Sequence, residues 1–94
     1  MAAYVIAQIT VTDPEGYKEY ASQTGDLAAK YGGRFLAKGG EARWLEGSGH
    51  DRNVIIEFPD MESAERWYNS PEYQAIAPIR AANSQGSLVV IQGV

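Results

Sequence analysis

The chain has 94 residues, of which 45% are hydrophobic and 21% are charged. This composition is typical of a globular protein rather than a disordered one, and the length predicts one domain spanning residues 1–94. The net charge of −4, without a cluster of Lys or Arg, argues against a nucleic-acid partner.

The sequence contains no cysteine, which excludes disulfides, thiolate metal sites and cysteine nucleophiles. A chain without cysteine and without a targeting signal is predicted to be cytoplasmic. The first residues, MAAYVIAQIT, lack a basic region and do not predict a signal peptide. No apolar run approaches the roughly 20 residues that a membrane span needs, so we expect no membrane partner.

Residues 3–11 alternate in polarity, and the odd positions are all apolar. This period of two, with β-branched side chains, predicts a strand. Asp13 and Pro14 then predict the start of a helix, with Asp as the N-cap and Pro at the first helical position. Apolar and aromatic residues continue at helical spacing as far as Tyr31, and Gly32-Gly33 ends the helix.

A short strand is predicted over residues 34–38, followed by a bulge or kink at Gly39-Gly40. Extended structure is expected again over residues 42–46, and residues 47–51 form a loop. Residues 52–58 are the next strand, so that 34–58 is interpreted as an antiparallel hairpin. Pro59 cannot donate a ladder hydrogen bond and ends it.

Two helical segments are predicted between residues 60 and 83. Asp60 caps the first, and Ser70 with Pro71 starts the second. The second segment fades by Asn83, and Pro78 inside it predicts a kink or an early end. Residues 85–87 are expected to turn the chain into a last strand over 88–92.

The resulting order, β-α-β-β-α-β, predicts an α+β protein of the ferredoxin-like class. Both helical layers should cover one face of a four-stranded antiparallel sheet, with strands 3–11 and 52–58 in its centre. The other face is expected to carry a mixture of apolar and polar side chains: Tyr4, Ile6, Gln8, Thr10, Ile55, Glu57 and some of Leu88, Val90 and Gln92. Such a face is too apolar for solvent, which predicts a homodimer whose sheets pack face to face. The alternative is a monomer with a half-apolar face.

Several stretches resemble the domain of unknown function 1330 family, which belongs to the dimeric α+β barrel superfamily. They are YVIAQITV, DPEGYKEYA, KYGGRFLAKGG, ARWLEG, NVIIEFPDMESAERWYNSPEY and PIRAAN. The resemblance covers nearly the whole chain and implies a ferredoxin-like protomer and a dimer. It implies no reaction. Relatives in the superfamily include cofactor-free monooxygenases, lactone isomerases and haem enzymes, which here is an analogy between folds only.

Glu57 is the first candidate catalytic residue, because it lies within a central strand between Ile56 and Phe58. A buried carboxylate is either paired or has a raised pKa, and both states suit acid–base chemistry. Alternatively, Glu57 pairs with an arginine or a tyrosine hydroxyl and has a purely structural role.

His50 is the second candidate, since it is the only histidine and Asp51 beside it can orient it as a general base. A solvated loop histidine is the alternative. The sequence contains no metal-ligand spacing, no phosphate-binding loop and no nucleophile elbow. We therefore expect neither a metal nor a cofactor.

Arg80, Tyr73 and Trp67 are the candidate substrate-binding residues. Arg80 shares a helical face with Tyr73 and can bind a substrate carboxylate in bidentate fashion, or it can pair structurally with Glu57 or Glu46. The aromatic residues are core residues that can also line a cavity between the helices and the sheet.

Two functional hypotheses follow. In the first, a homodimer binds a small organic molecule and acts on it by cofactor-free acid–base or oxygenation chemistry. In the second, the homodimer is a non-catalytic ligand-binding or structural module.

Overall fold

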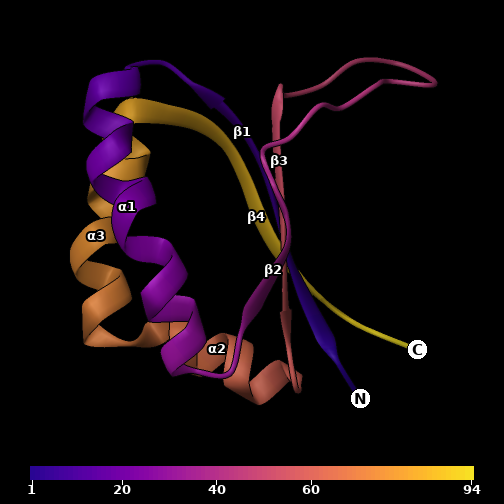
Figure 1. Cartoon of the computed structure of the whole chain (residues 1–94), viewed down its shortest axis with the longest axis vertical. Coiled ribbons are helices and arrows are strands. Elements are labelled where there is room, and N and C mark those ends of the chain that lie inside the picture. Colours follow the sequence, from indigo (N-terminus) through magenta and orange to yellow (C-terminus); the bar gives the residue numbers. More distant parts are fainter.

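The computed structural model describes residues 1–94, the whole chain. Its elements in chain order are β1 (Ala3–Val11), α1 (Pro14–Lys30), β2 (Arg34–Lys38), β3 (Arg52–Phe58), α2 (Met61–Asn69), α3 (Pro71–Asn83) and β4 (Ser84–Gln92). The strands form one antiparallel sheet in the order β2-β3-β1-β4. All three helices lie on one side of this sheet (Figure 1). The predicted ferredoxin-like α+β architecture, with β1 and β3 in the centre, is confirmed.

Side-chain caps begin each helix at the predicted residues. The Asp13 carboxylate accepts a hydrogen bond from the Gly16 amide at 3.3 Å, and the Asp60 carboxylate accepts one from the Ser63 amide at 2.7 Å. The latter bond holds the pKa of Asp60 below its usual value, because it favours the charged form. Ser70 caps α3 in the same way through the Tyr73 amide.

Helix α3 ends at Asn83, as predicted, and it runs through Pro78, so the alternative of an early end at this proline is wrong. Pro78 lies on the exposed side of α3. There the carbonyl that proline leaves without a donor can be hydrogen-bonded by water, which lowers the cost of the missing bond.

The core lies between the sheet and the helices. It is built from alternate residues of β1 and β3, which point towards the helices, and from the aromatic and small residues of the helices. Its members are Val5, Ala7, Ile9, Tyr17, Tyr20, Ala28, Val54, Ile56, Phe58, Ala64, Trp67, Tyr73 and Ile76.

Residues 39–51 form an arm rather than a strand, so the extended segment expected over 42–46 is not part of the sheet. The arm projects beyond the sheet on the side away from the helices (Figure 1). A bulge between Phe35 and Ala37 shifts the β2–β3 register, and the pairing ends at Lys38. Gly39, with φ 73°, then takes a left-handed conformation that turns the chain out of the ladder.

Strand β4 differs from the prediction in its first residue and in which of its side chains lie on the open face of the sheet. It begins at Ser84, directly after α3, so residues 85–87 belong to the strand and not to a turn. Val89 pairs with Ile6, and Ile91 pairs with Tyr4. These two residues of β4 therefore share the open face, and Leu88, Val90 and Gln92 lie on the helix side. Sequence alternation alone cannot tell which set of a strand faces the core, because that depends on the register.

Gly86 is the position of β4 at which a side chain has no room. A Cβ atom there would lie 2.0 Å from the carbonyl oxygen of Gln8 on β1. Its φ of 155° is also one that other residues rarely adopt. We expect Gly86→Ala to lower the free energy of unfolding by about 2 kcal/mol or more, measured by urea denaturation.

Gly40 provides the matched control, because no atom lies within 4 Å of a Cβ placed there. Gly40→Ala should leave the free energy of unfolding unchanged or slightly raised. Equal effects of the two substitutions would contradict the close approach of β4 to β1.

Candidate functional site

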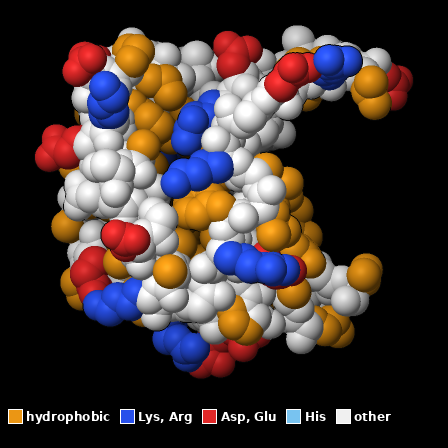
Figure 2. Space-filling view, in the orientation of Figure 1, with side chains coloured by type: hydrophobic (Ala, Val, Ile, Leu, Met, Phe, Trp, Pro, Cys, Tyr) orange, Lys and Arg blue, Asp and Glu red, His pale blue; other side chains and the backbone are white.

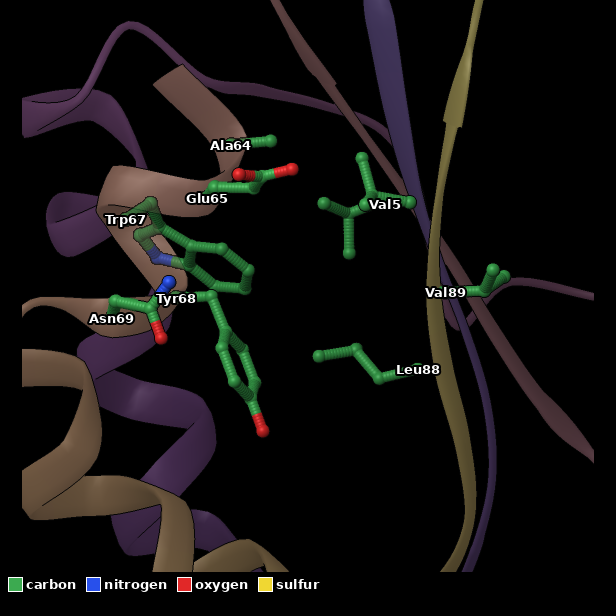
Figure 3. Close-up of a pocket in the computed structure, with 9 residues that line it drawn as sticks. Val5, Ala64, Glu65, Trp67, Tyr68, Asn69, Leu88 and Val89 are labelled. Atoms are coloured by element: carbon green, nitrogen blue, oxygen red, sulfur yellow. The ribbon is translucent and has the colours of Figure 1, made fainter. Parts of the chain in front are cut away.

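An apolar pocket of about 320 Å³ lies between α2 and the sheet (Figure 3). Its volume is at the lower end of those typical of small-molecule sites. Seven of its nine lining residues are hydrophobic, and together they are Val5, Ala64, Glu65, Trp67, Tyr68, Asn69, Leu88, Val89 and Val90.

Helix α2 supplies one wall of the pocket. Helical spacing brings Ala64, Trp67 and Tyr68 to the same side of the helix. The six-membered ring of the Trp67 indole faces the strands, and the Tyr68 ring runs along the pocket (Figure 3). The sheet supplies the opposite wall through Val5 of β1 and Leu88 of β4.

Two polar groups of α2 lie at different ends of the pocket. The Glu65 carboxylate lies near Val5, whereas the Tyr68 hydroxyl points away from α2, towards the side of α3 (Figure 3). Both residues are exposed at the rim, and the rings between them form the apolar middle. The pocket therefore has two polar ends and an apolar centre.

A cluster of aromatic rings supports the α2 wall from behind. The ring centroids of Trp67 and Tyr73 lie 4.4 Å apart, and those of Tyr68 and Tyr73 lie 5.3 Å apart. The Tyr73 hydroxyl forms a buried hydrogen bond of 2.8 Å with the Tyr20 hydroxyl of α1. Burial, and next the neighbouring Tyr73, raise the pKa of Tyr20 far above its usual value of 10, so Tyr20 stays protonated in the folded protein.

Three of the five residues predicted to form a site lie on the helix side of the sheet. Trp67 lines the pocket and Tyr73 packs behind it. Arg80 is half-buried on α3 beside Tyr73, Tyr20 and Tyr68. The structure brings these three predicted substrate-binding residues together.

The two predicted catalytic residues lie on the open face instead. Glu57 is 24% exposed, accepts a hydrogen bond from Arg34 Nε at 2.8 Å and accepts another from the Tyr4 hydroxyl at 3.2 Å. His50 Nδ1 lies 2.8 Å from Thr10 Oγ1. Glu57 and Arg80 are thus on opposite sides of the sheet, and no hydrogen bond or ion pair joins them.

Glu57 and His50 are also distant from each other. Glu57 pairs with Tyr4, near the start of β1, whereas His50 contacts Thr10, near its end. Six residues of extended strand separate these two positions, which corresponds to roughly 20 Å. The structure therefore does not combine Glu57, His50 and Arg80 into one polar set, and the catalytic roles of Glu57 and His50 stay predictions.

The model of a family described as a domain of unknown function, DUF1330, matches residues 2–94. The chain belongs to this family. The predicted resemblance to the DUF1330 family is thereby confirmed. A comparison with curated protein sequences found no match.

Solved structures share the fold of this DUF1330 protein. A protein of unknown function from Rhodopseudomonas palustris has a TM-score of 0.80 at 18% identity, with 99% of this chain and 82% of that one covered. SnoaB, a cofactor-independent oxygenase from Streptomyces nogalater, has a TM-score of 0.69 at 17% identity, covering 99% and 93%. A dimeric ferredoxin-like protein of unknown function from Thermobifida fusca has a TM-score of 0.65 at 17% identity, covering 99% and 92%. These likenesses show the fold alone.

No three side chains of His, Cys, Asp or Glu come close enough together to hold a metal ion. None of the helices combines the length and the apolar character that crossing a bilayer requires.

The sequence interpretation did not identify Glu65, Asn69 and Leu88 as pocket residues. Glu65 and Asn69 lie at the edges of the apolar stripe of α2, where the sequence indicates only a solvated face. Leu88 is one of three β4 residues of which the sequence predicts some on the open face, whereas its pairing with Ala7 places it on the helix side. The apolar stripe of α2 could have identified Glu65 and Asn69, because residues at the edge of such a stripe line any space between the helix and the sheet.

The buried Tyr20 hydroxyl predicts a pH dependence of stability. Tyr20 keeps its proton in the folded state, whereas in the unfolded chain it ionises near pH 10. Its contribution is fully present below pH 10 and is lost as the pH rises further. Above that pH the free energy of unfolding should fall by about 1.4 kcal/mol per pH unit more in the wild type than in Tyr20→Phe, as measured by urea denaturation. Parallel pH profiles would contradict the buried, protonated state.

Proposed function

We propose that this protein is a homodimer in which each protomer binds a small, largely apolar organic molecule in the pocket between α2 and the sheet. The observation that carries this proposal is the pocket itself, which is apolar in its centre, has polar groups at two ends, and is walled by two aromatic rings. A concave, mainly apolar site with a few polar groups is the usual form of a small-molecule site.

The homodimer is supported by the chemistry of the open face. Val89 and Ile91 are each 48% exposed there, next to the partly exposed Ile6 and Ile55 of the central strands. A contiguous apolar surface of this kind is typical of an interface. The relative from Thermobifida fusca, which shares the fold, is described as dimeric.

The arm, residues 39–51, supports the same interface. It overhangs a hollow on the open side of the sheet where hydrophobic side chains gather (Figure 2). Leu45 is 94% exposed and Trp44 is 45% exposed, although Trp44 packs over the backbone of Gly49. A second copy seated in the hollow would cover both the open face and these two side chains.

The homodimer is tested by placing a charge within the apolar part of the open face. Val89→Lys should convert the dimer to a monomer, because the two-fold packing of the sheets would bury two lysines without partners. Light scattering coupled to size-exclusion chromatography measures the mass. Gln74→Lys, on the exposed side of α3, is the matched control and should leave the dimer intact. A wild-type protein that is a monomer at micromolar concentration would disprove the homodimer.

Ligand binding is tested by filling the pocket. We expect 2-naphthalenemethanol, an uncharged two-ring probe, to shift the backbone amide resonances of Ala64, Trp67 and Leu88 in a heteronuclear NMR titration. Leu88→Trp should abolish these shifts at Ala64 and Trp67, because the larger side chain occupies the space of the probe. Gln74→Trp adds the same side chain outside the pocket and should preserve them. Shifts that survive in Leu88→Trp would place the probe elsewhere.

A second candidate function is cofactor-free oxygenation of the bound molecule. It is favoured by the fold shared with SnoaB, described as a cofactor-independent oxygenase, and by the apolar pocket, which would shield a reactive carbanion from water. The group able to accept a substrate proton there is the Glu65 carboxylate at the rim. Oxygen uptake that requires an organic substrate and is lost in Glu65→Gln would support catalysis, and its absence favours the binding module.

A further inference from the structure

Arg80 is a half-buried cation without an acidic partner. The four ion pairs of the protein join Lys30, Arg34, Arg43 and Arg66 to glutamates. No carboxylate lies within salt-bridge distance of Arg80, and its Nε is buried without any hydrogen-bond partner. An unpaired, partly desolvated guanidinium is costly, so an anion that binds there would be stabilised strongly.

The surroundings of Arg80 do not supply this anion. Its neighbours are the hydroxyl-bearing rings of Tyr73, Tyr20 and Tyr68. The Tyr20 and Tyr73 hydroxyls form a hydrogen bond with each other. Neutral hydroxyls can accept a hydrogen bond from a guanidinium, but they leave its charge uncompensated.

Tyr68 is both a lining residue of the pocket and a neighbour of Arg80. Its ring lines the pocket, and its hydroxyl is directed towards the side of α3, the helix that carries Arg80 (Figure 3). Arg80 is on the same face of α3 as Tyr73 and Ile76, which point into the core. Arg80 is not itself one of the lining residues, so the Tyr68 hydroxyl marks the end of the pocket that lies towards Arg80, and the Glu65 carboxylate marks a negative end.

We propose that the ligand of this pocket is an aromatic monocarboxylate. Its ring lies between the Trp67 indole and Leu88, and its carboxylate accepts hydrogen bonds from Arg80 and from the Tyr68 hydroxyl. Glu65 would repel a second carboxylate at the other end, which selects acids with a single charge. This inference rests on the proposed function, because it names the class of molecule that the same pocket takes.

Arg52 is the other arginine whose Nε is buried without a partner, and it does not offer an equivalent site. Its guanidinium lies over the Tyr17 ring at 5.5 Å, which partly compensates its charge. The space beside it measures about 20 Å³, enough for one water molecule but not for a carboxylate-bearing ligand.

The test compares two probes with the same two-ring body, 2-naphthoate and 2-naphthalenemethanol, by isothermal titration calorimetry. The wild type should bind the acid about 10- to 100-fold more tightly than the alcohol, as expected for charge-assisted hydrogen bonds in a partly buried site. Arg80→Gln should remove most of this preference, because it weakens the binding of the acid far more than that of the alcohol.

Two further variants separate a specific site from general attraction. Arg66→Gln removes the same charge from the exposed, Glu62-paired arginine of α2 and should keep the preference for the acid. Arg80→Lys keeps the charge but loses the bidentate fork, so it should retain only part of the preference. If Arg80→Gln does not fold, Arg80→Lys is compared with the wild type in its place.

The outcomes distinguish this inference from the proposed function. Equal binding of acid and alcohol by the wild type would overturn the carboxylate while leaving a ligand pocket. Equal loss of acid binding in Arg66→Gln and Arg80→Gln would also overturn it, because the effect would then follow net charge. If neither probe binds the wild type, both the inference and the proposed pocket function are wrong.

Discussion

The alternation of side chains along β1 and β3 is the constraint on which the rest of the structure depends. One set of residues, including Val5 and Ile56, packs against the helices and forms the core. The other set, including Ile6 and Glu57, faces away from the helices. Because the strand repeat is two residues, a slip of one residue in the pairing would exchange the two sets and expose the core. The register of the central strands therefore determines both what is buried and what is available to a partner.

The aromatic cluster of Trp67, Tyr68 and Tyr73 forms a rigid wall between this core and the candidate pocket. Rings in contact at 4.4–5.3 Å make a stiff wall, since each ring limits the rotamers of the next. Such a wall preserves a space beside it instead of collapsing into it. Behind this wall, the buried hydrogen bond between the Tyr20 and Tyr73 hydroxyls joins α1 to α3. The pocket is thus held open by packing that also stabilises the fold.

Much of the fold follows from local rules in the sequence. The caps Asp13, Asp60 and Ser70 mark the helix starts, and the alternation over residues 3–11 marks the strand. The errors occur where the outcome depends on distant contacts: the facing of β4 depends on its register with β1, and residues 42–46 leave the sheet after a bulge. The same limit applies to the site. Tyr73 and Arg80 share one helical face, which the spacing of the sequence predicts. The separation of Glu57 from Arg80 cannot be predicted in this way, because it depends on the sheet that lies between them.

The two tryptophans of the chain lie in contrasting environments. Trp67 is 1% exposed within the core and borders the pocket, whereas Trp44 is 45% exposed on the arm. Indole emission shifts with the polarity around the ring, so the protein carries two intrinsic optical reporters. The emission of Trp67 follows events in the pocket, and that of Trp44 follows events at the arm. Replacing either one with phenylalanine would let ligand binding and self-association be followed separately, without an added label.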